Sequence, residues 1–281
     1  PLLKKVGYPV AVNASDKLAT HARDNDWPQL KFETRGMPQL EHLVRTVLVA
    51  ESMVATTALG AVSKRLGVNS TSNANRVTQL LGSLGAGFAG LDFEIEGQKN
   101  LRHDQPVVYV FNHQSLLDSV VLAHLLKKDV VAMCKAEMAS NPVVGPLLRQ
   151  VDTIFVDRQE TNQNRVLSEA LQVLSSGRSL VIAPEGTRST LGEIQPFKHG
   201  ALMLAKRAGV PVVPIVLHNV KDALPKGALL LRPATIRVSV LEPIEPEQIN
   251  GIRKTCTALE QRYSELLGKS KRAALPYSAT A

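Results

Sequence analysis

The chain has 281 residues, of which 44% are hydrophobic, and its 33 Lys and Arg against 25 Asp and Glu give a formal net charge of +8. This length accommodates one large α/β domain with appendages or two small domains, and the composition excludes disordered and collagen-like chains. A basic chain attracts nucleic acid, anionic lipid headgroups or phosphorylated ligands, although an ordinary soluble surface can carry the same charge. Aromatic residues make up only 4% and no RNA-stacking motif occurs, so we expect no nucleic-acid partner.

The two cysteines, Cys134 and Cys256, are far apart in the sequence and lack the spacing of a metal site. We interpret both as reduced, buried thiols in a reducing compartment and expect no metal ion.

The first 33 residues predict a strand, a helix and a second short strand. Residues 6–13 are β-rich, Asp16 begins a helical pattern, and Trp27 and Pro28 end it. A piece of this length cannot bury a core alone, so we expect it to be the end of a domain. Residues 34–38 predict a linker.

Apolar residues recur at helical spacing in two stretches, residues 41–66 and 73–91. The first is long enough to reach across a bilayer, but Arg45 and Glu51 within it favour a helix that lies in the interface. Glycines in the second allow close approach to another helix or to lipid. The sequence therefore predicts a membrane-docking helical pair over residues 39–91, with a hairpin packed on the core as the alternative.

From Asp92 onward, short apolar runs alternate with helical stretches. This alternation predicts an α/β fold over residues 92–268, with a mostly parallel central sheet flanked by helices. The predicted strands are residues 93–95, 107–111, 130–133, 153–156, 180–183, 212–217 and 236–241. The predicted helices are residues 116–126, 143–150, 162–175, 200–208 and 246–267. Residues 269–281 predict a flexible tail.

A histidine and an aspartate, five residues apart, follow the predicted strand at residues 107–111. His113 stands at the strand exit, and Ser115 is a candidate helix N-cap that places Asp118 in the first helical turn. A tight turn can return this carboxylate to the imidazole, fix its tautomer and leave the other ring nitrogen to accept a proton. The same pair could also be a helix cap without a catalytic role.

A second polar cluster, residues 184–189, follows the strand at 180–183. Gly186 permits close approach of a ligand, Thr187 can donate a hydrogen bond, and Arg188 can bind a phosphate through two parallel hydrogen bonds. Lys198 precedes another helix, where anions bind well, and Arg158 follows the strand at 153–156. Each of these residues also fits an ordinary surface turn or ion pair.

Four blocks in this order resemble the glycerolipid acyltransferase family, best the 1-acylglycerol-3-phosphate O-acyltransferases. The blocks are residues 112–118, 155–158, 184–189 with 197–200, and 210–215. The resemblance covers residues 41 to 267. It departs from the family pattern at Ala183, where the family often has phenylalanine, which is a change in packing.

The resemblance implies that His113 deprotonates the acceptor hydroxyl and that Asp118 orients His113. The alcohol then attacks the thioester directly, without an acyl-enzyme, and a further set of residues binds the glycerol phosphate. This set is Arg158, Glu185, Gly186, Thr187, Arg188 and Lys198. No cofactor or metal is expected; acyl-CoA or acyl carrier protein is the co-substrate. The implied product is phosphatidate, made from lysophosphatidate for phospholipid biosynthesis at the cytoplasmic face of the cell membrane, by a peripheral or monotopic protein.

A second resemblance concerns residues 7–28. The run from Gly7 to Asn13, followed by Asp16 and the Trp27-Pro28 pair, resembles the closing segment of a haloacid-dehalogenase-type phosphatase. Ala14 replaces the usual proline. The resemblance implies a covalently linked phosphatase domain, in a fusion of the kind found in bacterial lipid enzymes, whose catalytic aspartates would precede Pro1.

Three other functions share parts of this pattern. Acylation of glycerol 3-phosphate shares the first and third blocks, a thioesterase or lipid hydrolase would use water as acceptor, and a non-catalytic lipid- or phosphate-binding module would need no base. The presence of His113, Asp118, Glu185 and Arg188 together disfavours the last of these.

Overall fold

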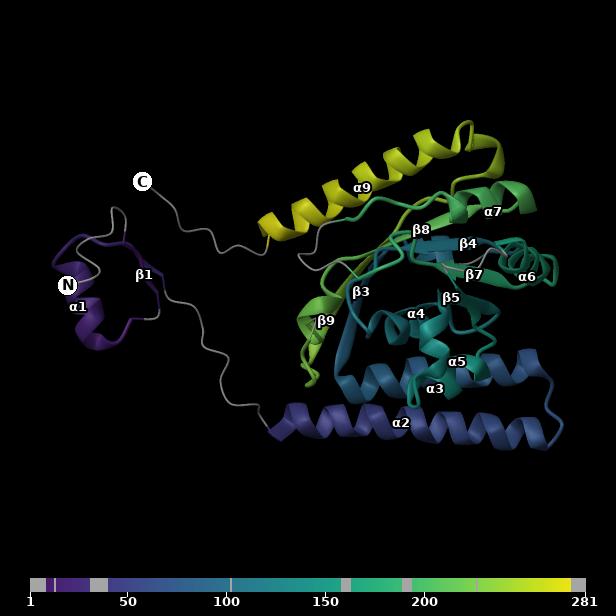
Figure 1. Ribbon diagram of the computed structural model, residues 1–281, viewed down its shortest axis with the longest axis horizontal. Helices are drawn as coiled ribbons and strands as arrows, with labels where there is room; N and C mark the ends of the chain where they lie inside the picture. Colours follow the sequence, from purple (N-terminus) through teal and green to yellow (C-terminus); the bar gives the residue numbers. More distant parts are fainter. Residues whose placement is uncertain are drawn as a thin grey trace. The chain divides into compact units, whose positions relative to one another are not determined.

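The structure is a computed structural model that describes residues 9–12, 14–30, 40–101, 103–157, 163–188, 194–225 and 227–273 (Figure 1). The chain forms two compact units, Pro1–Glu41 and His42–Ala281. The predicted linker at residues 34–38 lies outside the described residues, as do Arg158 and Ser189.

The first unit has the predicted order of strand, helix and strand. Strand β1 (Ala11–Val12) pairs in parallel with β2 (Gln29–Leu30), and helix α1 (Asp16–Arg23) connects them. Ala22 is fully buried under this crossover. The His21 ring meets the Trp27 ring edge-on, with the ring centroids 5.3 Å apart.

The second unit contains a seven-stranded sheet in the order β3-β9-β8-β4-β7-β5-β6. All neighbouring strands are parallel except β8 and β9. The strands are β3 (Leu91–Glu96), β4 (Val108–Phe111), β5 (Val130–Lys135), β6 (Ile154–Val156), β7 (Ser179–Ile182), β8 (Val212–Leu217) and β9 (Ala234–Val240). The predicted fold class is confirmed, and each predicted strand overlaps an observed one.

Helices cover both faces of this sheet. They are α2 (Leu40–Arg65), α3 (Ser70–Ala89), α4 (Asp118–Leu126), α5 (Val144–Gln150), α6 (Gln163–Ser175), α7 (Gly200–Ala208), α8 (Val220–Ala223) and α9 (Ile252–Ala273). Short 3₁₀ turns lie at η2 (Gln98–Leu101), η3 (Ala136–Ser140) and η4 (Pro246–Gln248). In Figure 1, α3 and α4 lie on one side of the sheet and α7 and α9 on the other.

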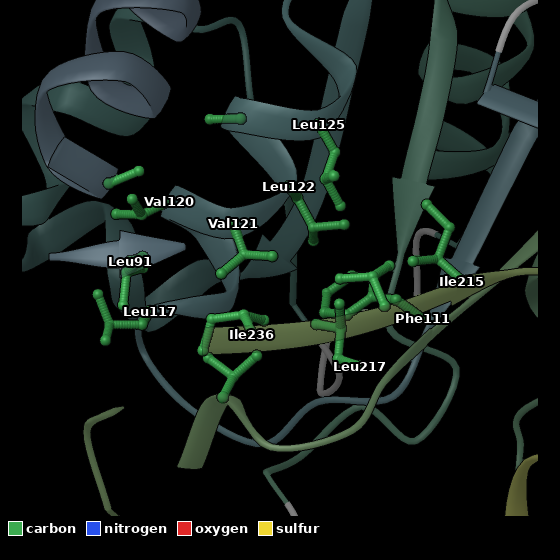
Figure 2. Packing of buried hydrophobic residues seen from close by; sticks show 14 of the residues in the cluster. Leu91, Phe111, Leu117, Val120, Val121, Leu122, Leu125, Ile215, Leu217 and Ile236 are labelled. Carbon is green, nitrogen blue, oxygen red and sulfur yellow. The ribbon is translucent and has the colours of Figure 1, made fainter. Parts of the chain in front are cut away.

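Strand β4 illustrates why the central strands read as continuous apolar runs. Its four residues are all buried because helices cover both faces. Tyr109 and Phe111 join the core beneath α3 and α4, whereas Val108 and Val110 join the core beneath α6, α7 and α9. Figure 2 shows the first of these cores, where Phe111 and Leu217 of the sheet meet Val121 and Leu122 of α4.

The two helices of the predicted membrane-docking pair have different surroundings. Helix α3 packs closely on α4, because a Cβ added at Gly82 would lie 2.5 Å from the backbone of Ala123. Helix α2 lies beside α3 and touches it at Gly60, near the Val77 side chain. Only a narrow stripe of α2 is buried, namely Val49, Ser52, Thr56 and Gly60. By length and composition α2 could cross a membrane, and no other helix in the described ranges meets that criterion.

Both predicted boundaries of the last helix move. The last helix begins at Ile252, because Pro246 opens a separate 3₁₀ turn closed by a reciprocal Glu245–Gln248 capping box. The same helix continues to Ala273, past the expected start of the flexible tail at residue 269. Residues 274–281 lie outside the described residues.

Candidate active site

His113 lies at the carboxyl edge of the sheet, just beyond β4. Strand β4 sits between β8 and β7, and both neighbours run parallel to it. The segment Ala183–Arg188 leaves β7 at the same edge, so the first and third sequence blocks meet where ligands bind in open α/β sheets.

The turn after β4 brings Asp118 back to His113. The imidazole Nδ1 and the carboxylate Oδ2 are 2.7 Å apart, and the side chains are 29% and 1% exposed respectively. Asp118 is the first residue of α4, and the turn is closed by a hydrogen bond from its N–H to the Ser115 carbonyl. Ser115 lies two residues before Leu117, the residue that precedes α4; its Oγ accepts the Leu117 N–H at 3.3 Å, as expected of a capping serine, and its hydroxyl donates to the Leu224 carbonyl.

Asp118 Oδ2 accepts two further hydrogen bonds, from the backbone N–H groups of Gln114 at 2.7 Å and Ser115 at 3.0 Å. Burial raises the pKa of this carboxyl, while the hydrogen bonds from His113, Ser115 and Gln114 lower it. The balance leaves the pKa of Asp118 raised above its ordinary value, while the three donors that converge on one oxygen favour the ionised form. With Asp118 ionised, His113 Nδ1 carries the proton and donates a hydrogen bond to Asp118 Oδ2. Nε2 then keeps a lone pair that can accept a proton.

Glu185 joins the first block to the third. Its Oε1 accepts the backbone N–H of His113 at 2.9 Å, and its Oε2 accepts that of Gln195 at 2.9 Å. Burial raises the pKa of Glu185, opposed by these two hydrogen bonds. Each carboxylate oxygen therefore serves a backbone amide, and the side chain fixes the positions of two loops.

The remaining predicted ligand-binding residues surround this edge. Gly186 has φ +66°, the left-handed region that glycine adopts without strain, in a turn where its N–H donates to the Ala183 carbonyl. Arg188 is partly exposed, and Thr187 and Lys198 are exposed. The loop before α7 is held at this edge because the Lys198 N–H donates to the Pro184 carbonyl at 2.9 Å. The placement of Arg158 lies outside the described residues, but Asp157 directly precedes it after β6.

Two amides beside His113 have a role that the sequence analysis did not assign. The Asn112 side chain donates to the Leu217 carbonyl and accepts from the Leu217 N–H, both at 2.8 Å. Gln114 Nε2 donates to the same carbonyl at 2.7 Å. These buried amides continue the β4–β8 pairing past the end of the strands. In the sequence, this role is signalled by an amide side chain on each side of the histidine that ends the strand.

Together these contacts hold a half-exposed imidazole in one orientation. The backbone around it is fixed by Glu185, Asn112 and Gln114, and its Nδ1 by Asp118. A base held in this way can remove a proton from a hydroxyl group that approaches Nε2. Among the described residues no group of three or more His, Cys, Asp or Glu side chains is arranged to hold a metal ion.

Residues 92–218 match the family model described as Acyltransferase. The human 1-acyl-sn-glycerol-3-phosphate acyltransferase beta is 33% identical over 159 residues, which is 56% of this chain and 57% of that protein. The human alpha enzyme is 35% identical over 179 residues, 63% of each chain. The 1-acyl-sn-glycerol-3-phosphate acyltransferase of Limnanthes alba is 31% identical over 175 residues, 62% of each chain. This chain thus matches about three fifths of the length of these relatives.

A solved structure, the 1-acyl-sn-glycerophosphate (LPA) acyltransferase PlsC from Thermotoga maritima, shares the fold. Its TM-score is 0.67 at 24% sequence identity, covering 85% of this chain and all of that one. The region that carries His113, Asp118 and Glu185 is therefore similar in sequence to the acyltransferase family, and the chain is similar in fold to a member that acts on lysophosphatidate.

Proposed function

We propose that this chain transfers a fatty acyl group from a thioester to the free hydroxyl of lysophosphatidate, giving phosphatidate. The observation that carries the proposal is the 2.7 Å contact between His113 Nδ1 and Asp118 Oδ2 at the edge of an acyltransferase-like sheet. Relatives named for the same reaction support the choice of acceptor.

The proposed reaction needs one base and no covalent enzyme intermediate. His113 Nε2 takes the proton of the acceptor hydroxyl as the oxygen attacks the thioester carbonyl. The tetrahedral intermediate then expels the thiolate, which takes the proton from the imidazolium, so an ester and a thiol leave. The buried Asp118 stabilises the imidazolium between these two steps. The donor is acyl-CoA or acyl carrier protein, and no other cofactor takes part.

The acceptor phosphate is proposed to bind beside His113, on Gly186, Thr187, Arg188 and Lys198, together with Arg158. Arg188 emerges from the loop after β7, next to the strand that carries His113. Within the described ranges its guanidinium forms no hydrogen bond with another side chain, so these donors can serve a phosphate. Glu185 belongs to the same site through the backbone amides that it holds.

The test is an acceptor comparison with purified protein. Thiol release from acyl-CoA is measured alone, with lysophosphatidate and with glycerol 3-phosphate, and the lipid product is identified by mass spectrometry. We expect release that depends on lysophosphatidate and yields phosphatidate. His113→Ala should lower the rate by about 10²–10⁴-fold while the melting temperature changes little. Equal release without acceptor would instead indicate a thioesterase, and a preference for glycerol 3-phosphate would change the acceptor.

A membrane surface is proposed as the site of action, because the acceptor is an amphiphile. Helix α2 exposes large apolar side chains along its length, among them Leu43, Val47, Val54 and Val62. Lys64 and Arg65 at its end are exposed cations that favour anionic headgroups. Leu229, which is 85% exposed, lies two residues from Leu231, whose N–H donates to Thr46 of α2. Both cysteines are free thiols, which agrees with a location at the cytoplasmic face.

A linked phosphatase-type domain is the last part of the proposal. The parallel pairing of β1 and β2 around α1 supports it, since so small a parallel unit is expected to extend a larger sheet. Sequencing the encoding gene upstream of Pro1 tests it. Aspartate motifs of the phosphatase type in that region support the fusion, and an unrelated upstream sequence contradicts it.

A further inference from the structure

The C-terminal helix α9 lies outside the residues that match the acyltransferase family model, yet it contacts strand β4, which leads to His113, and the loop before α7. One face of α9 enters the core beneath β4, β8 and α7 through residues spaced three or four apart. These residues are Cys256, Leu259, Tyr263 and Leu267. Figure 1 shows α9 running across this side of the sheet next to α7.

Tyr263 reaches the strand that carries His113. Its side chain is fully buried, and its hydroxyl donates to the Val110 carbonyl at 2.8 Å, while the Ile215 backbone forms a hydrogen bond with the same hydroxyl. Val110 pairs with Pro214 of β8, next to the Ile215 backbone that also bonds the phenol. The phenol thus supplies a donor within the sheet, three residues before His113.

Glu260 reaches the loop before α7. Its Oε1 accepts the Phe197 N–H at 2.6 Å, a short charge-assisted hydrogen bond. The Phe197 ring packs edge-on against the Tyr263 ring, with centroids 5.3 Å apart. The backbone N–H groups on either side of Phe197 bind within the site itself. That of Gln195 donates to the Glu185 carboxylate, and that of Lys198 donates to the Pro184 carbonyl. Phe197 is therefore the point where an element outside the site fixes the loop that presents Lys198.

We infer that Glu260 and Tyr263 are positioning residues of the active site, Glu260 for the phosphate-binding loop at residues 195–198 and Tyr263 for the strand end that carries His113. This inference rests on the proposed function for its kinetic consequences. Neither side chain touches a reacting atom; each acts through a backbone group of the site.

The first experiment compares Glu260→Ala with Glu260→Gln. Alanine removes the acceptor of the Phe197 N–H, and we expect the KM for lysophosphatidate to rise about tenfold while kcat stays within about twofold. Glutamine keeps a carbonyl oxygen at this position and should restore most of the wild-type KM. The matched control is Glu265→Ala on the same helix, whose exposed carboxylate pairs with the exposed Arg262; its kinetics should equal those of the wild type.

Hydrogen exchange provides a readout that does not depend on activity. In Glu260→Ala the amide of Phe197 should lose protection, while amides of α7 and β4 keep theirs. If the wild type transfers no acyl group to lysophosphatidate, the proposed function fails, and this exchange result still tests the positioning contact. Unchanged protection and unchanged KM in Glu260→Ala overturn the assignment of Glu260. So does an equal loss in Glu260→Gln, since charge and not the hydrogen bond would then matter.

Tyr263→Phe tests the second contact. It keeps the ring against Phe197 and removes only the hydroxyl, so the strand end that carries His113 loses the hydrogen bond to its Val110 carbonyl. We expect kcat to fall roughly three- to tenfold with the KM for lysophosphatidate within about twofold, the reverse of the Glu260→Ala pattern. Leu259→Ala, which leaves a cavity under α9 without removing a hydrogen bond, is the stability control. If Leu259→Ala has the same melting temperature as Tyr263→Phe and a similar fall in kcat, Tyr263 only supports the fold in general and does not position His113.

Discussion

One oxygen of the Asp118 carboxylate accepts hydrogen bonds from both a side chain and a backbone turn. Oδ2 accepts from His113 Nδ1 and from the N–H groups of Gln114 and Ser115, whereas the buried Oδ1 accepts no hydrogen bond from the described part of the chain. The backbone donors fix where an acceptor atom must sit. An amide at this position would therefore place its carbonyl oxygen at the Oδ2 site and keep the imidazole in the same orientation.

Asp118→Asn should consequently remove the negative charge of the side chain while keeping the positions of the loop and the imidazole. The variant should fold like the wild type but lose the negative charge that stabilises the imidazolium, lowering kcat about 10- to 100-fold with little change in KM. Asp118→Ala also removes the acceptor of two backbone N–H groups, so its loss of activity should be larger and its melting temperature lower. Steady-state kinetics and thermal melts of both variants check this. An asparagine variant as poor as the alanine variant would mean that the hydrogen bonds to Oδ2 do not hold the loop.

The raised pKa of Glu185 predicts that this residue contributes to the stability of the fold in a pH-dependent way. Burial raises its folded pKa above the ordinary value of 4.5, so the folded state binds a proton at higher pH than the unfolded state does. The wild type should therefore gain stability relative to Glu185→Gln as the pH falls from about 7 toward 4.5, and the difference should level off below that. Guanidinium-induced unfolding of the two proteins across this range measures it. A stability difference that stays constant with pH would contradict a raised pKa.

At the scale of elements, periodicity predicted the sheet and its helices but not the surroundings of α3. The apolar runs at residues 180–183 and 212–217 become buried strands β7 and β8, since only strands covered on both faces show such runs. The amphipathic pattern of α3 looks the same whether its apolar face meets lipid or another helix. The packing on α4 depends on contacts between segments far apart in the chain, which local spacing does not encode.

Helix α3 offers a matched pair of glycines for testing that packing. Gly82→Ala would place a Cβ 2.5 Å from the backbone of Ala123 and His124, so the helices must separate, and we expect a loss of about 1–3 kcal/mol of unfolding free energy. A Cβ at Gly87 meets nothing within 4 Å, and Gly87→Ala should gain about 0.5–1 kcal/mol through helix propensity. Chemical denaturation of both variants decides it. Equal effects would mean that α3 and α4 are not in close contact.

At the scale of the whole molecule, the sequence indicated that His113 and Asp118 lie together but not which distant residues support them. His113 and Asp118 follow a strand and lie one turn apart, so a contact between them was predictable from local spacing, and they are 2.7 Å apart. Glu260 and Tyr263 could not be chosen, because they contact the site across more than sixty residues of intervening chain and belong to no local motif. The net charge of +8 indicated an anionic partner without identifying the surface of the protein that meets it.

Helix α2 supplies a candidate for that surface, and charge placed on it should release the protein from membranes. Val54 and Leu59 are 62% and 52% exposed, so Val54→Glu combined with Leu59→Glu should not disturb the core. The double variant should lose flotation with anionic vesicles and lose more activity on vesicle-borne than on dispersed lysophosphatidate. For the wild type, high salt should weaken flotation without abolishing it, because the cations are screened and the apolar insertion is not.

The control introduces the same charges on the α7–α9 side of the sheet, where Met203 on α7 is 48% exposed and Thr257 on α9 is exposed as well. Met203→Glu with Thr257→Glu changes the net charge by the same amount and should leave flotation unchanged. If both double variants lose flotation equally, net charge alone governs binding and α2 has no special part in it. If the wild type stays with the soluble fraction at low salt, the apolar face of α2 does not dock on lipid under these conditions.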